Sequence, residues 1–221
     1  MNKMIIAVDG PAGSGKSTVA REVAKKLSML YIDTGAMYRA FTLKAMNENI
    51  SFENEKVLID LFHNTDISLK HEGEALRVFL DKEDVTESIR SLDVTSNVKH
   101  LALLKGVRKN MVSLQRDLAR AATSGAVLEG RDIGTVVFPD AKFKFYLDAS
   151  IDVRAMRRFK ELKEKGTKVS LEEIKKDVRE RDESDIKREI GPLKKAEDAI
   201  TVDTTGMTIE EVVERILKTC H

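Results

Sequence analysis

A glycine-rich segment near the start of the chain has the residue types needed to hold phosphate. Residues 7–18 read AVDGPAGSGKST, which matches the pattern G-x-x-x-x-G-K-[ST]. Glycine lets a backbone approach a ligand closely, so the N–H groups of this loop can surround a β-phosphate. Lys16 would reach the β- and γ-phosphates of a nucleotide, and the Ser17 hydroxyl would contact Mg²⁺. The residues that we assign to nucleotide binding are Gly10, Pro11, Ala12, Gly13, Ser14, Gly15, Lys16, Ser17 and Thr18.

The alternative interpretation of this segment is a glycine turn with an exposed lysine. The flanking residues favour phosphate binding, because an apolar run precedes the loop and Val19, Val23 and Leu27 recur after it at helical spacing. Phosphate binding leaves three classes open: a phosphotransferase, an NTPase motor and a GTP switch. The sequence has no Asn-Lys-x-Asp element for guanine. A motor usually has a hydrophobic strand ending in a carboxylate pair, whereas Glu129 is followed by glycine and arginine.

Arginines further along the chain could hold a second phosphate. A kinase with a phosphorylated acceptor must hold two anionic groups together, and guanidinium groups bind phosphate oxygens in bidentate fashion. Arg39 lies on the first turns of a predicted helix that begins near the end of an apolar run. Arg131-Asp132 follows a buried strand at its carboxyl end, where open α/β sheets bind ligands. The spacing i, i+4, i+7 predicts one helix face for Arg181, Asp185 and Arg188.

Each of these clusters also has a structural interpretation, and the spacing alone leaves it open. Arg39 could be a surface residue, and Arg131-Asp132 could be a loop ion pair. The charged helix around Arg181 could be a solvated face joined by i,i+4 ion pairs. No single cluster decides between the two interpretations.

A further basic group, Arg154, Arg157 and Arg158, lies on the predicted helix before Gly166. A helical hairpin from about 151 to 189, with Lys165 at its tip, is typical of a lid that closes over donor phosphates. Such closure excludes water, which would compete with the acceptor as nucleophile. The alternative is a solvated pair of charged helices.

The elements that must position these residues alternate between strands and helices. Apolar runs predict strands at residues 4–8, 126–128, 143–147 and 199–202. Helical spacing predicts helices after the glycine loop, after Gly35, around 57–62, from about 96 to 122 and from 155 to 162. Ser170 with Glu173, and Thr208 with Glu211, are capping-box signatures that begin two more helices. Alternating residues from Ile67 to Leu80 predict an antiparallel hairpin within a helix-rich region. We therefore predict an α/β fold with a parallel sheet flanked by helices.

Composition sets the outer limits. The chain has 221 residues, 42% hydrophobic and 34% charged, which predicts one folded body with insertions. A formal net charge of +1 gives no general reason to expect nucleic-acid or membrane binding. Cys220 is the only cysteine, so no internal disulfide can form. The N-terminal apolar run is too short for a signal peptide and no segment is apolar enough to span a bilayer, so we expect a cytoplasmic protein, and a monomer by default.

Taken together, the motifs resemble those of the bacterial cytidylate kinases, the P-loop nucleoside monophosphate kinases that make CDP from CMP and ATP. The resemblance covers nearly the whole chain, and its segments are VDGPAGSGKST, YIDTGAMYR, GVR at 106–108, EGRDIGTVVFPDA at 129–141, YLDAS, RERDESDIKREIGPL at 179–193 and DTT at 203–205. The P-loop alone is generic. The segments GRDIGTVVFPDA and RERD…D…KR…PL are specific to the family.

The resemblance implies transfer of the ATP γ-phosphoryl group to CMP or dCMP, with Mg²⁺ bound. The implied contacts with the acceptor are Thr34, Arg39 and Arg131 at the phosphate, Arg108 and Asp132 at the cytosine, Arg181 and Asp185 at the ribose, and Arg188 between base and phosphate. Arg154, Arg157 and Arg158 resemble lid residues that clamp ATP phosphates, with Lys16, Arg131, Arg157 and Arg158 as the catalytic cations. The loop at 203–205 resembles the segment beneath adenine.

The resemblance also implies a division by role and shows two departures. The core is expected at about 1–38, 108–150 and 190–221, an acceptor-binding insert at about 39–107 and the lid at about 151–189. Glu129 stands where many members have Asp. Lys99 stands nine residues before Arg108, where a small hydroxyl residue that touches the base is expected. Alternatives within the same chemistry are UMP, AMP or a small alcohol as acceptor, and a different class is a nucleotide-dependent binding protein whose P-loop serves as a switch.

Overall fold

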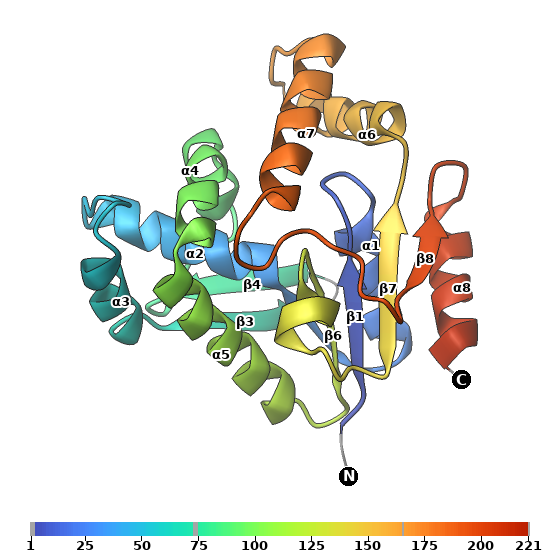
Figure 1. Cartoon of the computed structure of the whole chain (residues 1–221), viewed down its shortest axis with the longest axis horizontal. Helices are drawn as coiled ribbons and strands as arrows, with labels where there is room; N and C mark the ends of the chain where they lie inside the picture. The colour runs from blue at the N-terminus through green and yellow to red at the C-terminus, as the bar shows by residue number, and fades with distance from the viewer. Residues whose placement is uncertain (1–2, 73–74, 165, 221) are drawn as a thin grey trace. The chain divides into compact units, whose positions relative to one another are not determined.

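The structure is a computed structural model that describes residues 3–72, 75–164 and 166–220. The chain forms two compact units (Figure 1). The first consists of Met1–Tyr31 with Ala119–His221, and the second of Ile32–Leu118. This division rests on packing within each unit. The sequence instead predicts a division by catalytic role, into core, insert and lid. That division stays a prediction.

A five-stranded sheet forms the centre of the first unit, in the order β2-β6-β1-β7-β8. Its strands are β1 (Ile5–Asp9), β2 (Leu30–Asp33), β6 (Ala126–Gly130), β7 (Phe143–Asp148) and β8 (Ile200–Asp203). The pairs β1–β6, β1–β7 and β7–β8 are parallel. The predicted α/β class with a parallel sheet is confirmed. The short strand β2, which runs across the boundary of the two units, was not among the predicted strands.

Helices cover this sheet and extend beyond its carboxyl edge. They are α1 (Lys16–Lys26), α6 (Ile151–Glu164), α7 (Leu171–Ile186) and α8 (Ile209–Cys220). Helix α1 packs against β6 and α8. Both predicted capping boxes are confirmed: Ser170 and Glu173 bond reciprocally at α7, and Thr208 and Glu211 do so before α8.

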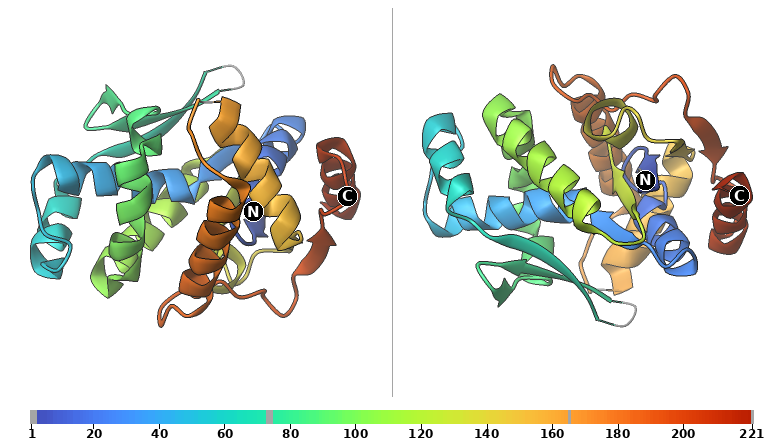
Figure 2. Two further views of the ribbon diagram at one scale, coloured as in Figure 1. Left: turned by 90° about the horizontal axis from the view of Figure 1, so that it is seen from above. Right: turned by 90° about the horizontal axis from the view of Figure 1, so that it is seen from below.

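Helices α6 and α7 form a hairpin with a small core of its own (Figure 2). Ala155 and Leu162 of α6 pack against Ile174 and Val178 of α7. Lys165, predicted at the tip, lies outside the described residues. The prediction that Arg188 shares a helix face with Asp185 is wrong, because α7 ends at Ile186 and Gly191 takes a positive φ of 58° soon after.

The second unit is built around α2 (Thr34–Asn47). Its other elements are α3 (Glu55–His63), β3 (Ile67–Glu72), β4 (Ala75–Leu80), β5 (Glu83–Asp84), a 3₁₀ turn at Ser88–Arg90, α4 (Leu92–Leu103) and α5 (Lys105–Ala121), which continues into the first unit. Phe41 of α2 is fully buried and meets Phe62 edge to face, with ring centroids 5.0 Å apart. The predicted hairpin is confirmed as β3 and β4, while Gly73 and Glu74 lie outside the described residues.

The helical region predicted from 96 to 122 is two helices. Leu104 has extended dihedrals and separates α4 from α5. The backbone N–H of Gly106 donates to Glu55 Oε1 at 2.5 Å, so a side chain from α3 accepts a bond that an unbroken helix would direct to its preceding turn. The break therefore depends on a residue far away in the sequence.

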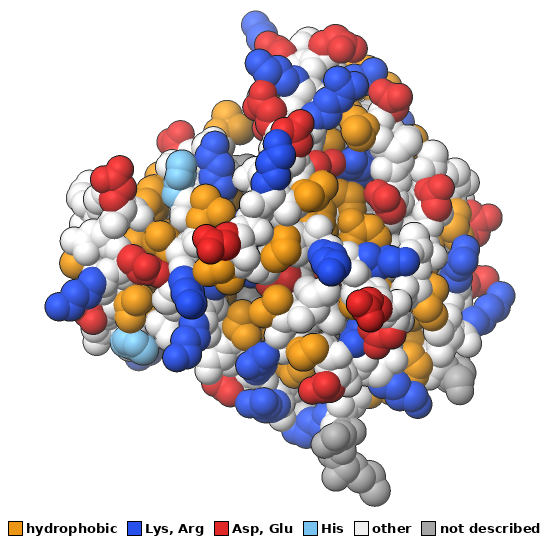
Figure 3. Space-filling model, viewed as in Figure 1, with side chains coloured by type: hydrophobic (Ala, Val, Ile, Leu, Met, Phe, Trp, Pro, Cys, Tyr) orange, Lys and Arg blue, Asp and Glu red, His pale blue; other side chains and the backbone are white. Residues whose placement is uncertain are grey.

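The surface mixes charges of both signs. On the face in Figure 3, Lys and Arg side chains are interspersed with Asp and Glu. Exposed ion pairs such as Lys187–Glu183 and Lys176–Glu180 lie along α7. Among the described residues, no helix has the length and apolar character needed to cross a bilayer.

Candidate functional site

The glycine loop connects β1 to α1 and depends on backbone conformations that favour glycine. Gly13 and Gly15 have φ values of 76° and 89°. A Cβ on Gly10 would lie 2.0 Å from the carbonyl oxygen of Leu147 at the end of β7. The loop is therefore pressed against the neighbouring strand, and its path requires glycine at this position.

Lys16 folds back over this loop and is buried. Its Nζ donates to the carbonyl oxygen of Pro11 at 2.7 Å and to Ser14 Oγ at 3.5 Å. Burial and then the charge of Arg131 lower the pKa of Lys16 to about 7, against the raising effect of Glu129 and Asp9. The charge of a second cation, Arg131, therefore acts on the lysine of the loop.

Asp9, the last residue of β1, is buried directly before the glycine loop. Its Oδ1 accepts the backbone N–H of Ile133 at 2.8 Å, and its Oδ2 accepts that of Gly134 at 2.7 Å. These two residues begin a π-helical turn at Ile133–Val137. Burial raises the pKa of Asp9 to about 6, against the lowering effect of the two N–H donors.

Three of the predicted acceptor residues converge within the first unit. Arg131 Nε pairs with Asp185 Oδ2 at 2.7 Å, and Arg188 pairs with the other carboxylate oxygen of Asp185. Asp185 is only 4% exposed, so the interpretation as a solvated helix face does not hold for it. Arg131 thus forms an ion pair with a residue of α7.

Arg154 of α6 contacts the glycine loop and is shielded from solvent. Arg154 is buried, and it donates to the carbonyl oxygens of Ala149 at 2.9 Å and Ala12 at 3.1 Å. Its Nη2 also pairs with Asp182 Oδ2 of α7 at 2.7 Å. The side chain therefore joins the loop to both helices of the hairpin.

Arg157 joins the loop to the segment after β8. It donates to the Oγ1 of Thr204 at 3.1 Å and to the carbonyl oxygen of Thr204 at 2.8 Å, with a longer bond to Gly13 at 3.4 Å. The Thr204 hydroxyl donates in turn to the carbonyl oxygen of Ser14 at 3.1 Å. Arg158, in contrast, is more exposed and pairs with Glu161.

Two further predicted residues belong to the same unit. Asp132 is 7% exposed and lies between Arg131 and the π-helical turn. Arg181 lies on α7, and its charge contributes to the lowered pKa of Lys16. Glu129, at the end of β6, is buried and accepts the hydroxyl of Tyr31 at 2.9 Å.

The remaining predicted residues belong to the second unit. Asp33 caps α2 by accepting the N–H of Ala36 at 2.7 Å, which places Thr34 at the first position of the helix. Arg39 pairs with Asp33 at 3.4 Å, and its Nε is buried without an acceptor among the described residues. Arg108 is 3% exposed, donates to the carbonyl oxygen of Ala102 and lies over the ring of Tyr38.

The residues present suit Mg²⁺ held mainly by substrate phosphates. Ser17 is exposed on the first turn of α1, beside the buried Lys16. Among the described residues, no group of three or more His, Cys, Asp or Glu side chains could hold a metal ion. Magnesium in phosphotransferases is bound by few protein groups together with phosphate oxygens and water, so a lone hydroxyl at this place fits.

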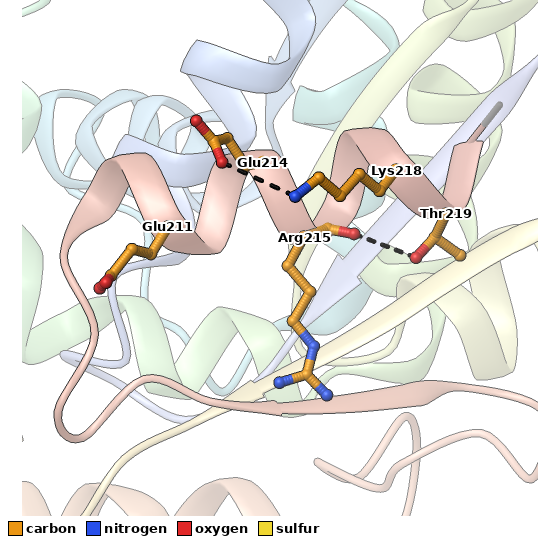
Figure 4. A pocket seen from close by; sticks show the side chains of 5 residues that line it. All are labelled: Glu211, Glu214, Arg215, Lys218 and Thr219. Atoms are coloured by element: carbon orange, nitrogen blue, oxygen red, sulfur yellow. Dashed lines mark hydrogen bonds and ion pairs between the residues drawn. The ribbon is translucent and has the colours of Figure 1, made fainter.

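A hollow elsewhere in the first unit has different chemistry. Figure 4 shows it on α8, lined by Glu211, Glu214, Arg215, Lys218 and Thr219. Lys218 pairs loosely with Glu214 at 3.9 Å, and Thr219 donates to the backbone of Arg215. None of the predicted site residues lines this hollow.

The sequence interpretation missed three residues of the site: Asp9, Asp182 and the bridging role of Thr204. The sequence did contain a signal for Asp9, because it is a carboxylate at the end of an apolar strand, directly before the phosphate loop. Carboxylates are rarely found at such buried positions. Asp182 and Thr204 carried none, because their partners lie on segments distant in the chain.

Comparisons with known proteins identify the family of the chain. The family model for cytidylate kinase matches residues 6–221. A cytidylate kinase of Clostridioides difficile is 50% identical over 217 residues, covering 98% of each chain. One of Caldanaerobacter subterraneus is 52% identical over 211 residues, covering 96% of this chain and 92% of the relative. Among solved structures, TT1252 from Thermus thermophilus has a TM-score of 0.51 at 21% identity, covering 100% of this chain and 97% of that one, which is a likeness of fold. The P-loop, the buried arginine network and these matches together show that the chain belongs to the cytidylate kinase family.

Proposed function

We propose that this protein transfers the γ-phosphoryl group of ATP to the 5′-phosphate of CMP or dCMP, giving ADP and CDP or dCDP. Two relatives that are about 50% identical to this chain, over nearly the whole length of both proteins, are named cytidylate kinases. The structural observation that supports the proposal is the buried Lys16 of the glycine loop, on which the charge of Arg131 acts. Burial and then the charge of Arg131 lower the pKa of Lys16, so anionic phosphates that lie against it would favour its charged form.

The proposed mechanism is in-line transfer that depends on positioning and electrostatics. An acceptor phosphate oxygen is already anionic near neutral pH, so no residue has to act as a general base. Lys16 would hold the donor phosphates, and Arg157 and Arg158 would offset charge that develops during transfer. Ser17 is the residue that would hold Mg²⁺, which would offset negative charge on the donor phosphates.

The acceptor contacts are proposed residue by residue. In the first unit, Arg131 would bind the acceptor phosphate, Asp132 the cytosine, Arg181 and Asp185 the ribose, and Arg188 the region between base and phosphate. In the second unit, Thr34 and Arg39 would bind the phosphate and Arg108 the cytosine. The buried Nε of Arg39 is a donor suited to a phosphate oxygen. Arg154, which also supports the loop backbone at Ala12, would bind the ATP phosphates.

The experiment that tests the function measures ADP formation from ATP with and without CMP. We expect turnover that depends on CMP and yields CDP, with Lys16→Ala losing most of it, because the transferred group then loses its buried cation. Lys218→Ala removes an exposed lysine on α8 and is the matched control. Near-normal CDP synthesis by Lys16→Ala would contradict the proposed role of the loop.

The same assay separates the alternatives. Running it with CMP, dCMP, UMP and AMP side by side identifies the acceptor. A nucleotide switch would hydrolyse ATP slowly and at the same rate whether or not CMP is present. The cytoplasmic location, the monomeric state and the absence of nucleic-acid or membrane partners stay predictions from the sequence.

A further inference from the structure

The anchor of the segment that carries Arg131 is the side chain of Asp9. Arg131 and Asp132 lie between strand β6 and the π-helical turn at Ile133–Val137. On one side of this pair, Gly130 is in register with Asp9 in the sheet. On the other side, Ile133 and Gly134 donate their N–H groups to the Asp9 carboxylate at 2.8 and 2.7 Å. A single residue of β1 therefore holds both ends of the Arg131-Asp132 dipeptide.

Asp9 also lies directly before the nucleotide loop, because the next residue is Gly10. Asp9 is thus joined covalently to the first residue of the nucleotide loop and by hydrogen bonds to the turn that follows Arg131-Asp132. A shift of Asp9 would move the loop lysine and Arg131 relative to each other. Catalysis by positioned charges is sensitive to such shifts, since a displacement of about 1 Å can reduce the rate about 100-fold.

The chemistry of the anchor requires a carboxylate. Both oxygens of Asp9 accept a backbone N–H, and the side chain is only 5% exposed, so water does not replace a lost acceptor. An asparagine of the same shape has one acceptor oxygen and one NH₂ group, which would face a backbone N–H donor. The charged groups that act on Asp9 from neighbouring elements are Asp132 and Lys16.

We propose that Asp9 is a positioning residue for phosphoryl transfer, which fixes Arg131 relative to the nucleotide loop through the N–H groups of Ile133 and Gly134. This inference rests on the proposed function, because the role of Arg131 is defined by that reaction. Asp9 itself touches neither nucleotide in this proposal.

A double-mutant cycle tests it. Asp9→Asn should lower kcat/KM for CMP by about 10- to 100-fold in the wild-type background. In an Arg131→Ala background, Asp9→Asn should lower kcat/KM for CMP by less than about 3-fold, because the residue that Asp9 positions is already absent. Equal factors in the two backgrounds would overturn the proposal. Asp140→Asn, the same change at an exposed side chain of the same unit, should stay within about 2-fold of wild type.

A measurement on the unaltered protein covers the case in which Asp9→Asn fails to fold. The amide signals of Ile133 and Gly134 should shift together as the pH is lowered and Asp9 is protonated, because protonation of its carboxylate removes an acceptor from one of them, and, where that variant folds, the same shift should be absent in Asp9→Asn. Amide signals that show no shared titration would overturn the proposal. This readout does not use turnover, so it stays informative even if the wild-type protein forms no CDP, which would instead contradict the proposed function.

Discussion

Asp185 is the point where two arginines from different parts of the chain meet. Arg131 follows β6 and Arg188 follows α7, and both pair with this one buried carboxylate. A carboxylate that accepts from two guanidinium groups holds both in fixed orientation, and its own charge partly offsets theirs. The network therefore presents oriented donors rather than an uncompensated pair of cations.

At this scale we predict that Arg188→Ala weakens CMP far more than ATP. The variant should raise KM for CMP by about 10-fold or more, because a charge-assisted bond to the acceptor is lost while Arg131 keeps its partner Asp185. KM for ATP should change by less than about 2-fold, since the glycine loop keeps its contacts. Steady-state kinetics with each substrate varied in turn measures both values. The control is Lys187→Ala, which removes an exposed neighbouring cation paired with Glu183, and unchanged CMP saturation in Arg188→Ala would contradict the assignment.

At the scale of elements, the segment after β8 supports the nucleotide loop. The Thr204 hydroxyl donates to Ser14 and accepts from Arg157, so it joins the loop to α6. Thr204 is 2% exposed, which leaves these groups without water as a replacement partner. The shape of the loop thus depends on a residue almost at the other end of the chain.

We predict that Thr204→Val raises KM for ATP by about 3- to 10-fold, because an isosteric methyl group leaves the Ser14 carbonyl without its buried donor. KM for CMP should change less. Thr219→Val is the matched control, since the Thr219 hydroxyl donates to the backbone of Arg215 on α8 rather than to the loop. Equal effects of the two variants on KM for ATP would contradict the role given to Thr204.

Elements with local signals were predictable from the sequence, and those that depend on distant residues were not. The capping boxes of α7 and α8 and the hairpin of β3 and β4 have complete local patterns. The break at Leu104 depends on Glu55, which no local pattern reveals. The sequence did not predict that α7 ends before Arg188, because the i, i+4, i+7 spacing is compatible with a continuous helix. For the site, residue types near Lys16 and Arg131 were found, whereas the anchor Asp9 was not.

For the whole molecule, the proposed reaction predicts selective stabilisation by ligands. A ligand present at 100 times its Kd raises the free energy of unfolding by about 2.7 kcal/mol. For a chain of this size the midpoint of thermal unfolding should then rise by roughly 5 to 11 °C. We expect this shift with ATP and with CMP, and a smaller one with UMP or AMP at the same concentration. A thermal melt followed by circular dichroism measures it, and a shift with AMP as large as that with CMP would contradict CMP as the preferred acceptor.

Arg154 links the hairpin of α6 and α7 to the nucleotide loop. Its guanidinium is joined to Asp182 on α7 and to the backbone of Ala12 in the nucleotide loop. The two helices of the hairpin also share a packed core of their own. A displacement of α7 relative to the loop would therefore break either the buried Arg154–Asp182 ion pair or the hydrogen bond from Arg154 to Ala12.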